Sequence, residues 1–328
     1  MINPLARLPG DPIARVILRV AIAAGLTAYI LWKSEPRAVL AAAAGADWRP
    51  IGVACLLVLA DRALMAYRWV ALLWTIDREA RPPLPDVIRI FFVSSFLGTF
   101  LPASIGGDAV RAYRLARLNV GGADAVASVF MDRMLGVASV LAMAVVGLGI
   151  ARDLAANTTI VAALAVTSAV CVVTLVVIFC RQTAAIAARV IARFPVALQR
   201  PGHRMLESVR RYASHRGALA NVLGCSLAVQ LLRIVQAYCL GLGLGIALPL
   251  TTYLAFIPLI LLVMLLPVTF NGIGTSQVAF VWFFARAGVP AASAFALSVL
   301  FVALGILGNL PGGILYAFDR GGQTRAIH

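Results

Sequence analysis

Charged residues are scarce in this sequence. They make up 12% of the 328 positions, whereas hydrophobic residues make up 62%. A soluble globular chain has about a quarter charged and about half apolar residues, so this composition excludes an ordinary soluble domain. Lysine is almost absent, since Lys33 is the only one, and the formal charge of +15 comes from arginine. The arginines lie between apolar runs, where they set topology and contact anionic head groups, so nucleic acid is not expected as a partner.

Residues and motifs that carry catalysis or bind metal are also few. The five cysteines lie in apolar runs without Cys-x-x-Cys spacing, and the three histidines lie outside these runs, so neither disulfides nor a metal site are predicted. Walker, Gly-x-Ser-x-Gly and paired-carboxylate patterns are missing. The glycine-rich segment 241–245 follows no strand and is read as a flexible helix end. The sequence therefore predicts neither a cofactor nor an enzyme.

Long apolar runs are abundant instead. A run of about 20 apolar residues crosses roughly 30 Å of hydrocarbon as a helix, and no alternating barrel pattern competes with this interpretation. The sequence therefore predicts an all-α membrane protein. Its full transmembrane helices are expected at residues 13–33, 49–74, 124–150, 158–180, 218–245 and 290–318.

Two further apolar stretches, 86–118 and 250–288, are interrupted by proline and glycine. The first breaks at residues 101–107 and the second at 266–274. Proline removes a helical hydrogen bond and glycine permits a sharp reversal, so each stretch predicts a re-entrant helical hairpin that turns near mid-membrane. For one break alone a tolerated kink is the better interpretation, but two breaks at matching positions favour hairpins.

The distribution of arginine predicts the orientation. Residues 181–216 hold eight arginines, so this connection is expected in the cytoplasm. With re-entrant hairpins both termini also lie inside, whereas full crossings would scatter the arginine-rich segments over both sides. The order span, span, hairpin, span then occurs twice, in 13–150 and 158–318, from opposite sides of the membrane. Matching interruptions in an inverted repeat indicate the midplane site of a transporter. The expected fold is a single membrane domain, 1–328, with six full transmembrane helices plus two re-entrant helical hairpins.

The hairpin tips supply candidate residues for binding a polar head group. At the first tip Gly106, Gly107 and Asp108 open the returning helix, whose N-terminal N–H groups suit a phosphate unless Asp108 caps them instead. Arg111, one turn further on, either pairs with Asp108 or reaches a lipid phosphate. The second tip offers neutral groups that satisfy the broken backbone or bind a polar head group: Asn271, Gly272 and Gly274.

Charged residues inside the spans are the other candidates. A charge at mid-membrane costs about 2.5–3.5 kcal/mol on insertion scales, so each should face a cavity or pair with a residue from another helix. Asp61 and Asp132 are such residues, and so are the arginines near them, although Arg68 is expected to snorkel to the interface. The polar tips and these charges predict a basic, hydrated cavity whose positive charge comes from Arg62, Arg133 and Arg233.

Two segments resemble the signatures of a known family. Residues 100–114, with Leu101-Pro102 and Gly106-Gly107-Asp108, resemble the first signature of the lysylphosphatidylglycerol synthase transmembrane-domain family, also called flippase-like. That family includes the membrane half of the bacterial multiple peptide resistance factor. Residues 266–280 and 310–313 resemble its C-terminal signature. Members often carry an Arg-Glu pair where Ser276 and Gln277 stand here, which puts in doubt any gate or head-group contact made by that pair.

The resemblance implies a multi-pass protein of the bacterial cell inner membrane that translocates or presents a lipid. In the best-known case the lipid is an aminoacylated phosphatidylglycerol, and the expected partners are a phospholipid, a hopanoid or an isoprenoid phosphate. The 328 residues leave no room for the soluble synthase domain, so we do not expect this chain to make a modified lipid. One alternative is a non-transporting partner of a hopanoid or glycan-lipid biosynthetic enzyme. Another is an intramembrane enzyme, which would need Asp61, Asp108 or Asp132 as its catalytic acid or base.

Overall fold

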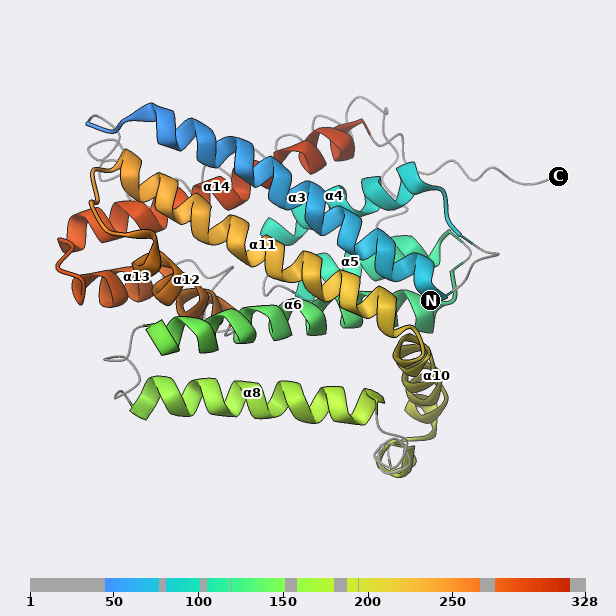
Figure 1. The fold of residues 1–328 in the computed structure, drawn as a ribbon. Coiled ribbons are helices and arrows are strands. Elements are labelled where there is room, and N and C mark those ends of the chain that lie inside the picture. Colours follow the sequence, from blue (N-terminus) through green and yellow to red (C-terminus); the bar gives the residue numbers. More distant parts are fainter. Residues whose placement is uncertain are drawn as a thin grey trace.

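The computed structural model describes most of the chain, and every regular element within the described ranges is a helix (Figure 1). The predicted first span, 13–33, and the tip residues Asn271, Gly272 and Gly274 lie outside these ranges. The described residues are 45–76, 81–100, 105–118, 120–150, 158–179, 188–193, 195–265 and 275–318.

Four of the described helices are long and apolar enough to cross a membrane. Each has 27 to 29 residues, about 40 Å at 1.5 Å per residue, which exceeds the hydrocarbon thickness of about 30 Å. They confirm four of the predicted spans, whereas the exact number of six spans and two hairpins stays a prediction. They are α3 (Trp48–Ile76), α6 (Gly122–Ile150), α11 (Arg216–Gly243) and α14 (Ala291–Ala317).

Both interrupted stretches form pairs of shorter helices. α4 (Leu84–Phe100) and α5 (Ile105–Ala116) pack on each other, and so do α12 (Leu250–Leu265) and α13 (Thr275–Ala285). In Figure 1, α12 and α13 lie towards the end of the molecule where α3 begins, and α4 and α5 lie towards the end where α3 finishes. The helices therefore end at the predicted proline and glycine segments. Re-entry of each pair into the membrane stays a prediction.

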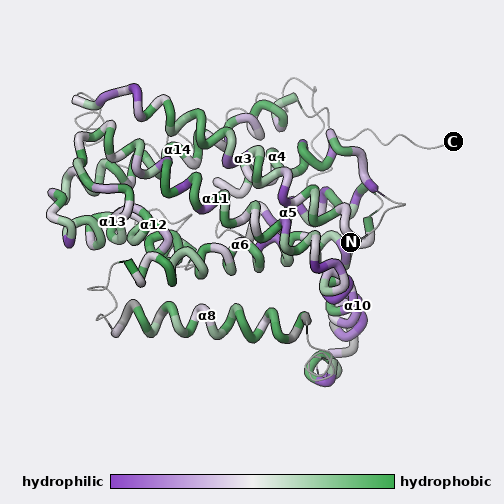
Figure 2. The backbone as a smooth tube through the Cα atoms, in the orientation of Figure 1, coloured by the Kyte–Doolittle hydropathy of each residue, from purple (hydrophilic) through white to green (hydrophobic). Residues whose placement is uncertain are grey.

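Two helices lie at the edge of the molecule. α8 (Thr158–Phe179) has the bounds of the predicted span 158–180 and packs on α6 and α10. α10 (Val196–Ala213) lies within the predicted connection 181–216, to which the sequence analysis assigned no secondary structure. Figure 2 shows hydrophilic residues gathered along α10, while its buried Val209 and Tyr212 contact the ends of the long helices. Apolar residues at this spacing between arginines are the amphipathic signal that would have predicted α10.

The long helices make a few close contacts that position everything else. α3 and α11 run side by side in opposite directions (Figure 1), and the Asp47 N–H donates to the Gly243 carbonyl at 2.9 Å. α4 packs on α14, and α12 packs on α6. A Cβ atom on Gly312 would collide with the Phe92 carbonyl of α4, and one on Gly147 would lie 2.7 Å from the Ala255 carbonyl of α12. We call these two glycine contacts the α4–α14 seam and the α6–α12 seam.

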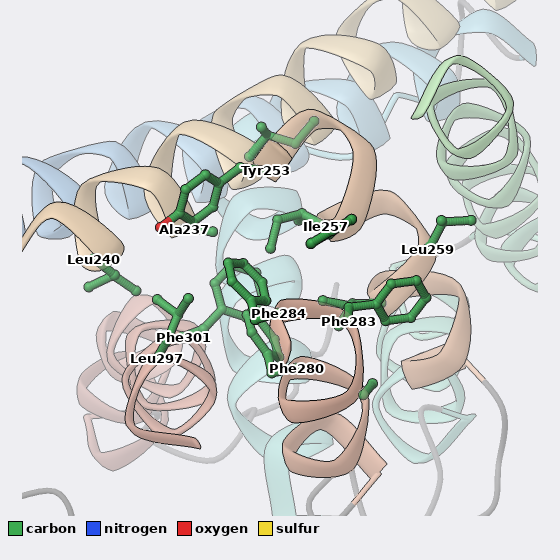
Figure 3. Close-up of a cluster of buried hydrophobic side chains, with 14 of the residues drawn as sticks. Ala237, Leu240, Tyr253, Ile257, Leu259, Phe280, Phe283, Phe284, Leu297 and Phe301 are labelled. Carbon is green, nitrogen blue, oxygen red and sulfur yellow. The ribbon is translucent and has the colours of Figure 1, made fainter. Parts of the chain in front are cut away.

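An aromatic cluster holds α13 against its neighbours (Figure 3). The rings of Phe280 and Phe284 stack with their centroids 5.8 Å apart. Phe284 also meets Tyr253 of α12 edge-on at 5.3 Å, and Phe280 meets Phe301 of α14 at 5.5 Å. Offset and edge-on aromatic pairs add roughly 0.5–1.5 kcal/mol each beyond the area that they bury. The second broken stretch is therefore fixed by apolar packing.

Helix α11 ends where the glycine-rich segment predicted an end. Gly245 has a φ of +72°, a left-handed conformation that glycine adopts without steric cost. The Ile246 N–H then donates to the Gly241 carbonyl at 2.8 Å, which is the bond of a Schellman cap. The segment 241–245 is thus a helix terminus, as expected.

Candidate functional site

A cavity of about 270 Å³ lies where both broken stretches reach the middle of the protein. Thr99, in the last turn of α4, lines it, and so does Met264, in the last turn of α12. The helices α3, α11 and α14 complete the wall. The other polar residues of the wall are Asp61, Arg62, Arg233, Gln236 and Asn309. The rest of the lining is apolar.

The cavity holds more positive than negative charge. Asp61 is 1% exposed, and the Arg233 Nε donates to its Oδ1 at 3.2 Å. The Nε of Arg62 lies 3.7 Å from the other carboxylate oxygen, and its Nη2 donates to the Gly305 carbonyl at 3.2 Å. Two guanidinium groups therefore share one carboxylate. A buried uncompensated charge is unfavourable, so this wall favours an anion.

The partners of Asp61 correct one expectation. Arg233 comes from another helix, as predicted. Arg62 is the chain neighbour of Asp61, and neighbours on a helix diverge by about 100°, which led us to expect partners from other helices only. The arginine side chain is long enough for its Nε to come back within ion-pair distance of the carboxylate.

Three polar atoms of the cavity residues have no hydrogen-bond partner in the described part of the chain. They are the Arg62 Nε, the Gln236 Nε2 and the Asn309 Oδ1, and each is buried. Buried polar atoms are nearly always paired, and an unpaired one costs about 1–3 kcal/mol. Two donors and one acceptor on the residues of this cavity are thus left without a protein partner in the described ranges.

A second charged cluster lies within the packing of α3, α5 and α6. The Asp132 carboxylate accepts from the Arg68 Nε at 2.8 Å and from the Arg111 Nη1 at 3.3 Å. None of the three residues is more than 5% exposed. The Arg111 guanidinium also lies 5.1 Å from the Trp69 ring and 4.7 Å from the Phe91 ring. Arg68 therefore does not snorkel to the interface, and Arg111 pairs with Asp132 where we had considered Asp108.

Asp108 pairs with Arg133 instead. The Arg133 Nε donates to Oδ2 at 2.6 Å and its Nη2 donates to Oδ1 at 3.0 Å, a bidentate pair between α5 and α6. The Arg133 side chain is 46% exposed and the Asp108 side chain 17%. This pair lies outside the residues that line the cavity.

The first-tip glycines have a packing role in the structure. A Cβ atom on Gly107 would lie 2.9 Å from the Gly98 Cα of α4, so glycine lets the two helices touch. Gly106 is half-buried at the start of α5. Of the candidate residues named from the sequence that lie in the described ranges, Asp61, Arg62 and Arg233 line the cavity, and the first-tip residues, Arg111 and Arg133 do not.

Sequence reasoning did not select Thr99 or Asn309 as a site residue, and it placed Gln236 only among the polar residues inside the spans that should face a cavity or pair together. Each is a neutral polar residue within an otherwise apolar helix, and that isolation is the signal that could have identified it. The sequence does not predict how α4, α11 and α14 are rotated about their axes, and this rotation brings the three side chains to one cavity.

Comparison with known proteins places the chain among membrane regions. It matches the family described as "Lysylphosphatidylglycerol synthase TM region" over residues 16–312, which covers all ten helices above except the last residues of α14. No curated protein sequence matches the chain.

Proposed function

Because the chain belongs to the lysylphosphatidylglycerol synthase TM region family, a membrane domain linked to lipid handling, we propose that it moves a lipid across the bilayer. The polar head group would occupy the cavity lined by Asp61, Arg62 and Arg233, while the acyl tails stay in the hydrocarbon. The observation that carries this proposal is that α4 and α12 both end at one cavity with excess positive charge. Interrupted helices that meet at a polar midplane site are typical of transporters.

The helix contacts support an inverted repeat of 13–150 and 158–318. In such a repeat α3 corresponds to α11, α4 to α12 and α6 to α14. The α4–α14 seam of the structure then corresponds to the α6–α12 seam. Gly147 and Gly312, the glycines of the seams, are separated by the same number of residues as Leu101-Pro102 and Leu266-Pro267. The opposite directions of α3 and α11 agree with two halves of opposite topology. In this arrangement α4–α5 and α12–α13 are re-entrant hairpins from opposite faces.

The arginines support an orientation with the chain ends in the cytoplasm. The Arg89 Nη2 donates to the Phe318 carbonyl, so the start of α4 lies beside the end of α14. Arg211 of α10 pairs with Asp124 at the start of α6. We place this arginine-rich end on the cytoplasmic side of the bacterial inner membrane by the positive-inside rule.

Residues near the cavity have assigned roles in this proposal. Arg62 and Arg233 bind the phosphate. The Asp61 carboxylate pairs with both guanidinium groups and fixes their positions. The Asp108–Arg133 pair and Arg111 hold α5 in place beside the first tip, with Gly106 and Gly107 in close packing. Head-group contacts during passage are assigned to the second-tip residues Asn271, Gly272 and Gly274.

Reconstitution into vesicles tests the proposal. We expect the purified protein to expose tail-labelled phosphatidylglycerol of the inner leaflet to an external quencher, at least about tenfold faster than protein-free vesicles. The variant Asp61→Asn, Arg62→Gln, Arg233→Gln removes all three charges together, so no buried charge is left unpaired, and it should lower the rate to the protein-free level. The matched control, Asp124→Asn with Arg211→Gln, removes an exposed pair far from the cavity and should leave the rate unchanged.

Two outcomes would redirect the interpretation. Undiminished movement of lipid by the triple variant would remove the cavity from the mechanism. If the wild-type protein retains lipid through purification but moves none, it presents a lipid to a biosynthetic enzyme, and mass spectrometry of the retained lipid would identify it.

A further inference from the structure

We infer that the cavity selects a lipid phosphodiester with one negative charge and a neutral, hydroxyl-bearing head group, and that it rejects a cationic aminoacylated head group. The inference rests on the proposed function and specifies its substrate class. It comes from the charge, the unpaired polar atoms and the volume of the cavity.

The charge of the wall sets the charge of the ligand. Arg62, Arg233 and Asp61 are the charged residues that line the cavity in the described part of the chain, and together they leave one positive charge. A phosphodiester carries one negative charge and neutralises it. A lysyl or ethanolamine head group would bring an ammonium group, which needs a carboxylate. The two oxygens of Asp61 already face Arg233 and Arg62, so none is free to receive it.

The unpaired atoms set the hydrogen-bonding pattern of the ligand. The Arg62 Nε and the Gln236 Nε2 are donors, which suits the oxygens of a phosphate. The Asn309 Oδ1 is an acceptor and needs a donor such as a hydroxyl group. A phosphodiester alone offers no donor at neutral pH. The head group beyond the phosphate must therefore provide one.

The orientation of the Asn309 amide is fixed by its neighbours. The Thr99 hydroxyl donates its proton to the Ser95 carbonyl at 3.1 Å. Thr99 Oγ1 therefore accepts from the Asn309 Nδ2, at 2.8 Å. With the Thr99 hydroxyl bonded to Ser95, the Asn309 amide nitrogen is engaged by Thr99, and the Oδ1 is the atom left without a partner.

The volume limits the size of the head group. Pockets for drug-sized ligands occupy roughly 300–1,000 Å³. At about 270 Å³ the cavity lies below this range and admits one small head group such as phosphoglycerol. A glycan of several sugars exceeds it.

A panel of tail-labelled lipids with identical acyl chains tests the inference in proteoliposomes. Phosphatidylglycerol has the required charge and hydroxyl groups, phosphatidylmethanol has the charge alone, phosphatidylethanolamine is zwitterionic, and lysyl-phosphatidylglycerol is cationic. We expect phosphatidylglycerol to move at least about tenfold faster than the two ammonium lipids. It should move about fivefold faster than phosphatidylmethanol, because that lipid leaves the Asn309 Oδ1 unpaired.

The outcomes separate this inference from the proposed function. If the protein accelerates none of the four lipids, lipid transport itself is refuted. If it moves all four at equal rates, lipid transport is retained and the selection among head groups is refuted. The selection is also refuted if lysyl-phosphatidylglycerol moves fastest.

Two variants locate the selection in the cavity. Asn309→Ala should abolish the difference between phosphatidylglycerol and phosphatidylmethanol, whereas Asn221→Ala, at an exposed position of α11, should preserve it. Arg62→Gln lowers the net charge of the wall to zero and should reduce the preference for phosphatidylglycerol over phosphatidylethanolamine. Thermal unfolding of each variant checks that it is folded, and unchanged selectivity in folded Asn309→Ala and Arg62→Gln proteins would overturn the assignment.

Discussion

Single residues decide how closely the helices of this protein approach one another. At Gly312 the backbone of α14 lies against the Phe92 carbonyl, whereas Gly224 of α11 has open space around its Cα. Both are helical glycines in apolar surroundings, and the sequence does not distinguish them. Only the neighbouring helix does, because the permitted volume at a Cα depends on what lies opposite it.

An alanine at each of these glycines should have opposite effects. Gly312→Ala places a methyl group against backbone that has no side chain to move aside, so we expect a loss of stability of about 1–3 kcal/mol or more. Gly224→Ala should stabilise by about 0.5–1 kcal/mol, because alanine loses less entropy in a helix. Thermal unfolding in detergent measures both. Equal shifts for the two variants would contradict the close contact at Gly312.

Charged residues show what a single sequence reveals about a site. Asp132, Arg68 and Arg111 stand in or beside apolar runs. From this we expected a cavity or a partner on another helix for Asp132, snorkelling for Arg68, and Asp108 or a lipid phosphate as the partner of Arg111. The identity of each partner could not be predicted, because it depends on the rotation of α3, α5 and α6 about their axes. Arg111 illustrates this, since its aromatic neighbours Trp69 and Phe91 lie far from it in the sequence.

Helix α5 is attached to α6 by two ion pairs with different surroundings. Arg111 and Asp108 stand one turn apart on α5, and they bind the neighbouring residues Asp132 and Arg133 of α6. The first pair is buried, and the second is partly exposed. Two attachment points fix both the position and the rotation of α5.

Exchanging the charges of the exposed pair tests its role in holding α5. Asp108→Arg and Arg133→Asp should each destabilise the protein, because each places two like charges together. The double variant should recover most of the loss, with a coupling of about 0.5–1 kcal/mol in unfolding measurements. Purely additive effects would show that the pair does not attach α5 to α6.

Helices were predictable from the sequence to the extent that they are apolar and long. The bounds of α3, α6, α11 and α14 agree with the predicted spans to within a few residues. The breaks after α4 and α12 followed from proline and glycine, which act locally. α10 was missed because its arginines suggested a solvated connection, although Met205, Val209 and Tyr212 recur at helical spacing.

The arrangement of the whole molecule leads to a prediction of topology. Arg89 precedes most of α4 and Arg117 follows α5, so a re-entrant hairpin leaves both on one side of the membrane, whereas a full crossing separates them. Arg286, between α13 and α14, should lie on the opposite side. Single cysteines at these positions, with the native cysteines replaced by alanine, can be labelled in bacterial cells with an impermeant maleimide.

We expect Arg286→Cys to react in intact cells, and Arg89→Cys and Arg117→Cys to react only after permeabilisation. Arg204→Cys on α10 serves as the internal reference for the arginine-rich end. Reaction of Arg89→Cys and Arg117→Cys from different sides would replace the hairpin by a crossing helix and would also remove the inverted repeat.

The two glycine seams restrict how such a protein can change shape. Separating α4 from α14, or α6 from α12, would lose the close van der Waals packing that Gly312 and Gly147 permit, and such packing is what holds helices together in a bilayer. The seams should therefore remain closed throughout the transport cycle that we propose. Movement is then left to the shorter helices α5 and α13. The first is held by a buried ion pair and by the partly exposed Asp108–Arg133 pair, and the second by aromatic rings. High salt should therefore weaken the attachment of α5 through its exposed Asp108–Arg133 pair and leave the packing of α13 unchanged.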